Sequence, residues 1–385
     1  MNLDLTEEQQ IIQDTARNFA KSELEPVAAK LDQEGDRETF LRNLKKLSDL
    51  GLMAINVKAQ YGGSEAGVVA FSLAVTEIAR ACASTACTLS VSNMVCEVIQ
   101  AVGSEEQKRT YIPKIASGEY PAGGFALTET MAGSDAGALR TQAVLDGNDY
   151  VLNGSKMFIT SAEYAGVFVV WAVTDKEKPK GKGISTFLVE NGTKGLTVGR
   201  AEHKMGQHAS ATNELLFEDC RVPKSALMGK LNGGFRVATG ELFGGRIGIG
   251  SLGLGVGLAA MDYAVRYVME RKQFNQPIAH FQAIQWMIAE SYTELEAARL
   301  LLMNAAFAKE QGRPFARQAA MAKFYATEAA ERACHNAVQM LGGYGYTNEF
   351  PIDRYYRDVR VSSIYEGTNQ IQRMIIAQDI LSRLK

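Results

Sequence analysis

The sequence contains few cysteines and few histidines. Its 385 residues include five cysteines, an odd number without a CxxC pair, and four histidines, none at zinc-ligand spacing from a cysteine. A disulfide framework needs paired cysteines, and a structural zinc site needs clustered Cys and His ligands. We therefore expect free thiols, a reducing compartment and no metal site.

The sequence also lacks an excess of charge of one sign. Lys and Arg number 41 and Asp and Glu number 43, so the formal net charge is −2. Nucleic acids and anionic lipid surfaces are bound through clustered Lys and Arg, so neither is expected as a partner. The apolar stretch at 165–173 is far too short to cross a bilayer, and we expect no membrane span.

The first ten residues, MNLDLTEEQQ, have none of the features of a targeting segment. They are acidic and contain neither an apolar core nor the Arg-rich and Ser-rich character of a transit peptide. They predict a cytoplasmic protein of bacterial type, whereas a location in the mitochondrial matrix would require removal of a presequence.

Hydrophobic periodicity divides the chain into three parts. The first part, 1–119, has apolar residues at helical spacing, for example in 40–50 and 68–83. Two capping-box patterns, Thr6–Gln9 and Ser104–Gln107, predict the starts of helices in it.

The second part, 120–230, has short β-branched and aromatic segments separated by turn residues. The predicted strands include 150–152, 167–173, 185–189 and 213–217, with turns at Asp146–Asn148, Asn153–Gly154 and Asn191–Gly192. The third part, 231–385, is helical again, with long helices predicted near 241–271, 280–311, 315–341 and 370–381. The order of helices, strands and helices predicts an α+β fold with three domains bounded as above.

One motif is misleading. Gly248–Gly253 satisfies the GxGxxG pattern of dinucleotide-binding folds, but no strand precedes it and the helical pattern continues to Arg271 without a second strand. We expect the glycines in this helix to allow a close approach of another helix or a ligand. We therefore reject a nicotinamide-binding fold.

Four stretches have residue types common in ligand sites, and each also has an ordinary structural explanation. The Gly/Ser/Asp turn in 125–135 suits a polar or anionic ligand, or is a simple turn. Phe158 and Thr160 share one face of a strand, as packing on a planar ring requires, or belong to a core strand. Arg271 would cap a helix, and Glu366, in the stretch 344–370, would normally be an acid at a helix start.

Taken together, these stretches resemble the acyl-CoA dehydrogenase family over essentially the whole chain, most closely its short-chain, butyryl-type members. The motifs stand in family order and spacing: FALTETMAGSDAGAL, NGSKMFIT, KMGQHAS, GRIGIGSLGLG, ERKQFNQPI, QMLGGYGY and RYYRDVRVSSIYEGTNQIQ. The resemblance implies an N-terminal helical domain, a central β-barrel-like domain and a C-terminal four-helix bundle. It also implies FAD between the domains and a homo-oligomer, a tetramer built as a dimer of dimers.

The resemblance also implies residue roles. Glu366 matches the catalytic base, Thr128 the hydroxyl at the flavin pyrimidine end, and Thr160 a residue near flavin N5. The stretch from Arg271 matches cofactor contacts that the family supplies from a neighbouring subunit. The implied substrate contacts are Ser134, Phe243, Arg246, Tyr365 and Gly367. The implied cofactor contacts are Phe125, Leu127, Thr128, Gly133, Ser134, Phe158, Ile159, Thr160, Arg271, Gln273, Phe274, Gln282, Gln339, Gly342, Gly343, Thr368 and Gln370.

The implied activity is α,β-dehydrogenation of an acyl-CoA to the trans-2-enoyl-CoA, in acyl-CoA degradation. Glu366 would take the α-proton, the β-hydrogen would leave as hydride to flavin N5, and electrons would pass to electron-transfer flavoprotein. A carboxylate in water is too weak a base for a thioester α-proton, so donors must stabilise the enolate. In the family these are the backbone N–H of the base, here Glu366, and a flavin ribityl hydroxyl. Exclusion of water should also raise the pKa of the carboxyl group.

Three departures bear on the substrate. Phe158 replaces a tryptophan common in the family, and Gly245 stands where branched-chain and long-chain relatives can place another glutamate base. No Arg or Lys occurs in 81–107, where relatives acting on glutaryl-CoA carry an arginine, so an acidic acyl tail is disfavoured. We expect a short, medium, branched or cyclic acyl chain.

Three alternatives stay open at this point. An acyl-CoA oxidase would release hydrogen peroxide under air. A desulfinase or other lyase of the family would use the same pocket, although the presence of Glu366 counts against the lyases that lack this base. A non-catalytic helical scaffold would purify without colour, and the joint presence of Glu366, Thr128, Thr160 and Arg271 speaks against it.

Overall fold

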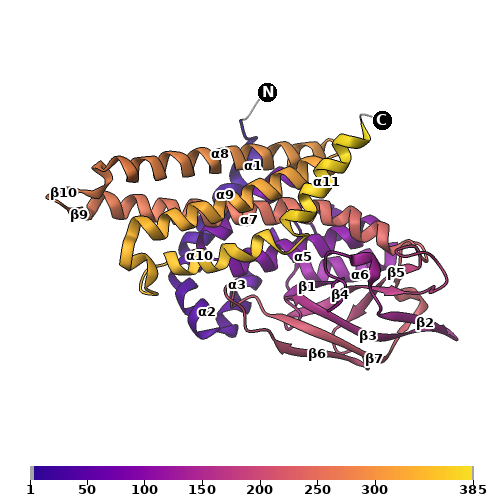
Figure 1. Ribbon diagram of the computed structural model, residues 1–385. Coiled ribbons are helices and arrows are strands. Elements are labelled where there is room, and N and C mark those ends of the chain that lie inside the picture. Colours follow the sequence, from indigo (N-terminus) through magenta and orange to yellow (C-terminus); the bar gives the residue numbers. More distant parts are fainter. Residues whose placement is uncertain (1–3, 384–385) are drawn as a thin grey trace.

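The chain folds into two helical parts that enclose one face of a β domain. A computed structural model describes residues 4–383. Seen from the side, the strands lie at one end of the molecule and the β9–β10 hairpin projects from the other (Figure 1). The expected α+β fold, with helices in the first and last parts of the chain and a sheet in the middle part, is confirmed.

The N-terminal part is helical, and both predicted capping boxes are present. Thr6 Oγ1 accepts from Gln9 N at 3.2 Å, and Ser104 Oγ accepts from Gln107 N at 3.2 Å. In each pair the glutamine side chain accepts from the backbone N–H of the capping residue, so two free amides are satisfied at each helix start. The helices are α1 (Glu7–Phe19), α2 (Ala28–Glu34), α3 (Arg37–Asp49), α4 (Gly67–Ala81), α5 (Ala83–Val102) and α6 (Glu105–Ala116).

The β domain is one mixed sheet in the order β6-β7-β3-β2-β4-β5-β8, with β1 added along β4. Strand β1 runs parallel to β4 and places its last residue, Ala126, opposite Val170. The strands are β1 (Ala122–Ala126), β2 (Gln142–Asp146), β3 (Asp149–Thr160), β4 (Ala165–Val173), β5 (Ile184–Glu190), β6 (Leu196–Ala201), β7 (Thr212–Pro223) and β8 (Leu227–Met228).

The turn predicted at Asn153–Gly154 is wrong. Both residues lie inside β3, where the register with β7 shifts between Leu152 and Gly154. Gly154 has φ 141°, and a Cβ there would come within 2.7 Å of Thr141 Oγ1. The glycine therefore marks a β-bulge with close backbone approach instead of a chain reversal.

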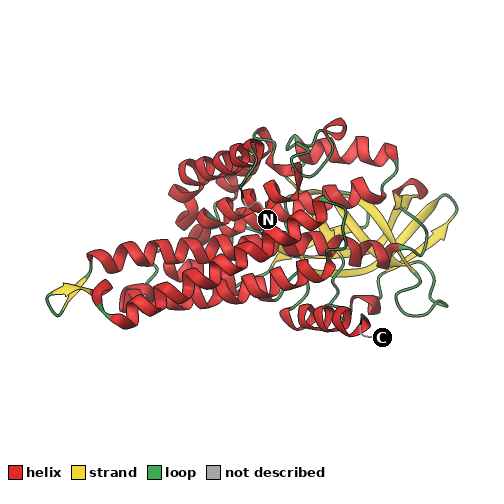
Figure 2. Cartoon of the chain, turned by 90° about the horizontal axis from the view of Figure 1, so that it is seen from above, coloured by secondary structure: helices red, strands yellow, loops and turns green. Residues whose placement is uncertain are grey.

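The C-terminal part is a bundle of long helices. Helix α7 begins at Gly234, seven residues before its predicted start, whereas the other three long helices begin and end within two residues of prediction. In projection from above, the helices form an elongated layer with the strands at one end (Figure 2). The elements are α7 (Gly234–Glu270), β9 (Lys272–Gln273), β10 (Gln276–Pro277), α8 (Gln282–Glu310), α9 (Ala316–Leu341), α10 (Ile352–Arg360) and α11 (Asn369–Ser382).

Helix α7 runs without interruption through the GxGxxG match, as expected after its rejection. A Cβ at Gly248 would lie 2.2 Å from Ser90 Oγ of α5, and one at Gly255 would lie 2.2 Å from the Thr76 carbonyl of α4. These glycines allow close helix packing, which offsets their cost of roughly 1 kcal/mol each in helix propensity.

The expectation that no apolar segment is long enough for a membrane span is wrong by length and composition. Helices α5 and α7 each contain an 18-residue apolar window, which small and hydroxyl residues conceal in the sequence. In both windows 78% of the residues are buried inside the fold, as in core helices, so the two helices are weak evidence for a span.

Candidate active site

A cavity of about 490 Å³ lies between the β domain and the C-terminal helices. This volume is within the usual range for pockets that bind small molecules. Helix α5 contributes Val91 and Met94 to its wall, and α7 contributes Leu242 and Ile249. The predicted site residues among its lining are Phe125, Leu127, Thr128, Gly133, Ser134, Phe158, Thr160, Arg246, Tyr365, Glu366 and Gly367.

Glu366 sits in a sharp turn that ends one helical segment and begins α11. It has φ 55° and is followed by Gly367 with φ 86°, so two successive residues adopt the left-handed region. Gln372 Nε2 donates to the Gly367 carbonyl at 2.8 Å, and Thr368 Oγ1 accepts from Ile371 N as the N-cap of α11. A glutamate in this conformation costs on the order of 1–3 kcal/mol and persists because the surrounding bonds fix it.

The carboxylate of Glu366 faces the cavity without a partner. Its Oε2 is buried and forms no hydrogen bond with any described residue. Burial raises the pKa of Glu366 to about 7, although the positive charges of Arg246 and Lys323 oppose this shift. A Cβ at Gly245 would lie 2.8 Å from Oε2, so the absence of a side chain there makes room for the carboxylate.

Arg246 is the buried cation of the same wall. Its Nε donates to the Glu366 carbonyl at 3.4 Å, and its Nη1 is buried without a hydrogen-bond partner among the described residues. Burial lowers the pKa of Arg246 to about 10. Phe243 is absent from the cavity lining; its ring packs against the Arg246 guanidinium, with 4.7 Å from Cζ to the ring centroid.

Another part of the cavity wall comes from the β domain. The Thr128 carbonyl accepts from Met157 N at 2.8 Å, which joins the end of β1 to β3. Beneath this joint, Lys156 Nζ donates to Glu129 at 2.7 Å and to the Leu127 carbonyl at 3.3 Å. Burial lowers the pKa of Lys156 to about 8, against the opposing effect of Glu129. This buried ion pair fixes the segment that carries Leu127 and Thr128.

The segment around Phe158 is bulged. Phe158 has φ 59°, and the register of β3 with β7 shifts between Lys156 and Ile159. As a result Phe158, 60% exposed, and Thr160 both line the cavity, as the shared-face prediction required. Ile159 is buried in the sheet core and is absent from the cavity lining.

The remaining predicted cofactor residues lie elsewhere. Arg271, Gln273 and Phe274 belong to the β9–β10 hairpin and its approach, at the end of the bundle away from the strands (Figure 1). The Arg271 guanidinium lies 5.9 Å from the Tyr344 ring, which brings the segment after α9 to the same end. This second group consists of Arg271, Gln273, Phe274, Gln282, Gln339, Gly342 and Gly343.

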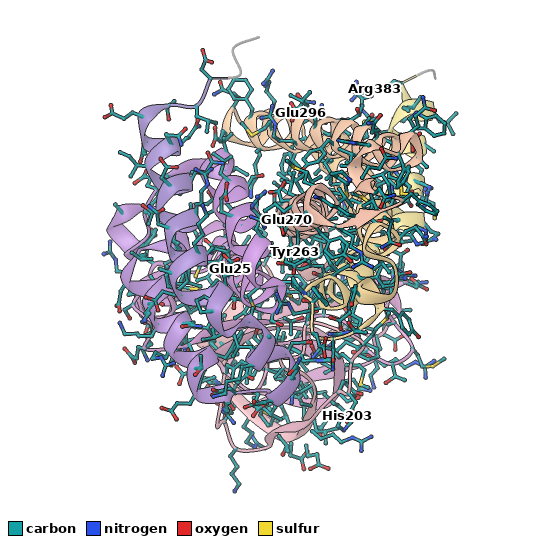
Figure 3. The ribbon with its side chains drawn as sticks, turned by 90° about the vertical axis from the view of Figure 1, so that its left-hand side faces the viewer. Glu25, His203, Tyr263, Glu270, Glu296 and Arg383 are labelled. Carbon is teal, nitrogen blue, oxygen red and sulfur yellow. The ribbon has the colours of Figure 1, made fainter. Side chains whose placement is uncertain are left out.

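Thr368 and Gln370 line a separate groove of about 460 Å³, together with residues of α9 and α10. A larger polar cavity of about 550 Å³ lies between the N-terminal helices and α7 and α10, with Glu25 and Tyr263 in its wall (Figure 3). Ion pairs such as that between Arg80 and Asp262 lie in the wall of this polar cavity. It includes none of the predicted site residues.

Two residues that hold the Glu366 turn escaped the sequence analysis. Lys323 Nζ donates to the Gly367 carbonyl at 3.0 Å, and Gln372 Nε2 donates to the same oxygen. A detectable signal existed for Lys323, because it stands at helical spacing with Ala319, Ala326 and Ala330 on the buried face of α9. Gln372 is the last residue of the motif RYYRDVRVSSIYEGTNQIQ, but the resemblance implies no role for it.

Comparison with known families places the chain. Three profiles described as the N-terminal, middle and C-terminal domains of acyl-CoA dehydrogenase match residues 6–119, 124–220 and 232–381. The fold and the cavity thus belong to an oxidoreductase acting on CH–CH groups. The chain belongs to the acyl-CoA dehydrogenase family.

Curated relatives match over nearly the full length. Acryloyl-CoA reductase (NADH) of Anaerotignum propionicum is 44% identical over 100% of this chain and 97% of its own. The short-chain specific acyl-CoA dehydrogenase of Clostridium acetobutylicum is 42% identical over 99% and 100%, respectively. The mouse mitochondrial short-chain enzyme is 45% identical over 99% and 92%. Because the relatives include bacterial and mitochondrial proteins, either location is compatible with this chain.

Solved structures agree. Butyryl-CoA dehydrogenase from Megasphaera elsdenii has a TM-score of 0.95 and 39% identity over 99% of this chain and 100% of its own. A chain from a structure described as the electron transferring flavoprotein of Acidaminococcus fermentans has a TM-score of 0.97 and 43% identity over 99% and 100%. Acyl-CoA dehydrogenase complexed with FAD from Bacillus anthracis has a TM-score of 0.93 and 32% identity over 99% and 68%. The expected FAD cofactor is confirmed by this membership.

Proposed function

We propose that this enzyme dehydrogenates a short-chain acyl-CoA to the trans-2-enoyl-CoA, with Glu366 as the base. The observation that carries the proposal is Glu366, which lines one cavity together with Thr128 and Thr160 and whose buried Oε2 has no hydrogen-bond partner among the described residues. A role as the base also explains why a glutamate is kept in the left-handed region at this position, next to Gly245, whose lack of a side chain leaves room for the carboxylate.

The residues present fit a flavin. The hydroxyls of Thr128 and Thr160 border the cavity with Phe158, and a Cβ at Gly133 would meet no atom within 4 Å, which leaves room at that edge. Phe125, Leu127 and Ser134 complete this wall. When bound, FAD supplies the two-electron acceptor for the hydrogen that leaves the β-carbon.

Glu366 would hold and remove the proton. A carboxyl group with a pKa near 7 is a stronger base than an exposed glutamate; about half of it is deprotonated at pH 7, and most of it at higher pH. Its backbone N–H is the expected donor to the thioester oxygen, where negative charge develops. Arg246 donates to the Glu366 carbonyl and so helps to fix the turn, while its Nη1 is buried without a hydrogen-bond partner among the described residues.

The shape and charge of the cavity favour a short, uncharged acyl chain. About 490 Å³ must accommodate both the flavin ring and the acyl group. The helical walls contribute apolar side chains, Val91, Met94, Leu242 and Ile249. The one acidic residue of α5, Glu97, is paired with Lys309 of α8. The relatives named for short-chain and butyryl substrates support the same choice.

Partners follow from the proposal. The electron acceptor would be electron-transfer flavoprotein, in keeping with the structural neighbour of that description. The second group of predicted cofactor residues, at the β9–β10 hairpin, would complete the cofactor site of a second copy of the chain. The assembly would be a tetramer built as a dimer of dimers. We propose a cytoplasmic location and a role in acyl-CoA degradation, as for a bacterial enzyme of this family.

The proposed activity is tested by anaerobic titration of the purified holoenzyme. Butyryl-CoA is expected to bleach the visible flavin absorbance more completely than octanoyl-, palmitoyl-, isobutyryl- or glutaryl-CoA. Absence of bleaching with every thioester would contradict the proposal. Steady release of hydrogen peroxide under air would instead identify an oxidase, and a protein without flavin colour a scaffold.

Replacing Phe274 with alanine should weaken FAD retention through the neighbouring copy. The side chain is 86% exposed, yet burying a phenylalanine contributes roughly 1.5–3 kcal/mol, so we expect about a tenfold or greater loss of FAD affinity. Flavin content after gel filtration and the mass of the oligomer measure this. Leu145→Ala, on the β2–β3 hairpin and 51% exposed, is the matched control and should change neither. Equal behaviour of the two variants would argue against a contribution in trans.

A further inference from the structure

Lys323 is a lysine in the core of the C-terminal bundle. Its side chain has 0% exposure, on the alanine-rich face of α9. Among the described residues it forms no ion pair, and its ammonium group donates to two neutral oxygens, the Gly367 carbonyl at 3.0 Å and Asn369 Oδ1 at 2.9 Å. Burying an ammonium group without a paired anion is costly, so its presence calls for an explanation.

The contacts of Lys323 converge on the turn that carries the base. Asn369, which accepts from Lys323, donates in turn to Thr327 Oγ1 at 3.0 Å. Gln372 donates to the same Gly367 carbonyl from α11. Two donors from different helices, one charged and one neutral, therefore hold a single carbonyl next to Glu366.

We propose that Lys323 is a positioning residue for Glu366, whose ammonium group fixes the Glu366–Gly367 turn and stabilises the carboxylate form of the base. The inference rests on the proposed function and adds a residue that acts through Glu366 without lining the cavity. A neutral donor such as Gln372 can supply the hydrogen bond but not the charge.

The charges around Glu366 support this role. The cations that act on its carboxylate are Arg246 on α7 and Lys323 on α9, and the buried hydroxyl of Tyr365 and thiol of Cys87 lie in the same electrostatic environment. Burial lowers the pKa of Lys323 to about 7, opposed mainly by Glu366. Glu328 and Glu331 act on Lys323 in the same direction as Glu366.

The charge states of Glu366 and Lys323 determine how the rate of flavin reduction should depend on pH. The base works as a carboxylate, so the rate of flavin reduction should rise with pH through the Glu366 pKa of about 7. On the acid side of pH 7 Lys323 is still largely protonated, so removal of its cation there disfavours the carboxylate, and the acid limb should move to higher pH by about one unit. At pH values below the acid limb, flavin reduction without the Lys323 cation should be about tenfold slower than in wild type.

Three variants separate charge from hydrogen bonding. Lys323→Met removes both, Lys323→Arg keeps the charge, and Gln372→Met removes only the neutral donor to the Gly367 carbonyl. We expect the acid limb to shift in Lys323→Met, to return toward wild type in Lys323→Arg, and to stay in place in Gln372→Met. Gln372→Met should lower the plateau rate instead. The readout is the rate of anaerobic flavin reduction by butyryl-CoA as a function of pH.

A second readout does not depend on activity. The carboxyl infrared band of Glu366, identified by its loss in Glu366→Gln, is titrated in each holoenzyme without substrate. Its midpoint should rise by the same unit in Lys323→Met, with flavin content unchanged. A midpoint that stays fixed in Lys323→Met, or shifts equally in Gln372→Met, would overturn the proposal. If no acyl-CoA bleaches the wild-type flavin, the proposed function fails while this titration still decides the role of Lys323.

Discussion

Glu366→Gln is expected to abolish reduction of the bound flavin by butyryl-CoA while both ligands still bind. The amide has nearly the shape of the carboxyl group but cannot accept the α-proton. A positioned general base contributes on the order of 10²–10⁴-fold, so the rate of bleaching should fall by at least that factor. Stopped-flow absorbance under anaerobic conditions measures it, with flavin content and butyryl-CoA affinity as checks of integrity.

The matched control is Glu294→Gln on α8. Glu294 pairs with Arg332 on the surface at 2.9 Å, so neutralising it removes a carboxylate far from the cavity. We expect its bleaching rate to equal that of wild type. Bleaching at the wild-type rate in Glu366→Gln would remove Glu366 from the mechanism and leave the cavity without an assigned base.

Gly245→Ala should produce the second large effect. The new Cβ would lie 2.7 Å from Met94 Sδ and 2.8 Å from Glu366 Oε2, both closer than real Cβ contacts allow. Since Met94 also lines the cavity, the methyl group must displace the carboxylate, the thioether or both. A displacement of about 1 Å at a reacting group can cost on the order of 10²-fold in rate, and we expect a loss of that size with FAD still bound.

Gly240→Ala, on the same helix, is the control for this substitution. A Cβ at Gly240 would meet no atom within 4 Å, and alanine improves helix propensity by roughly 1 kcal/mol. We expect unchanged bleaching and a slightly higher melting temperature. Equal activity of the two variants would show that the carboxylate does not depend on the space at Gly245.

Local signals in the sequence predicted much of the fold. The capping boxes at Thr6 and Ser104 satisfy their own helix starts, so neighbouring residues suffice to predict them. The bulge at Gly154 could not be predicted in this way, because its cause is the approach of Thr141 from the adjacent strand. Likewise, α7 begins at Gly234 in a segment with weak helix propensity, against which β5 packs closely at Ser185.

The candidate site likewise contains residues that motifs in the sequence identified and residues whose roles only the structure revealed. Motifs pointed to Glu366 and Arg246, and the fold brings both to one cavity with Thr128 and Thr160. The supporting residues Lys323 and Gln372 act through backbone carbonyls, and neither a place on a helix face nor the end of a motif predicts such contacts. Assignments that rely on a second copy, those around Arg271, stay predictions because they concern contacts between chains.

Helix α7 carries Arg246 in its first half and ends one residue before Arg271. At 1.5 Å per residue, the two arginines stand about 37 Å apart along a single rod. In the proposed assembly this rod would link the chemistry of one protomer to the dinucleotide tail held for its neighbour. Dissociation of one protomer would therefore impair two centres together, and dilution should cause activity and flavin retention to decline in step.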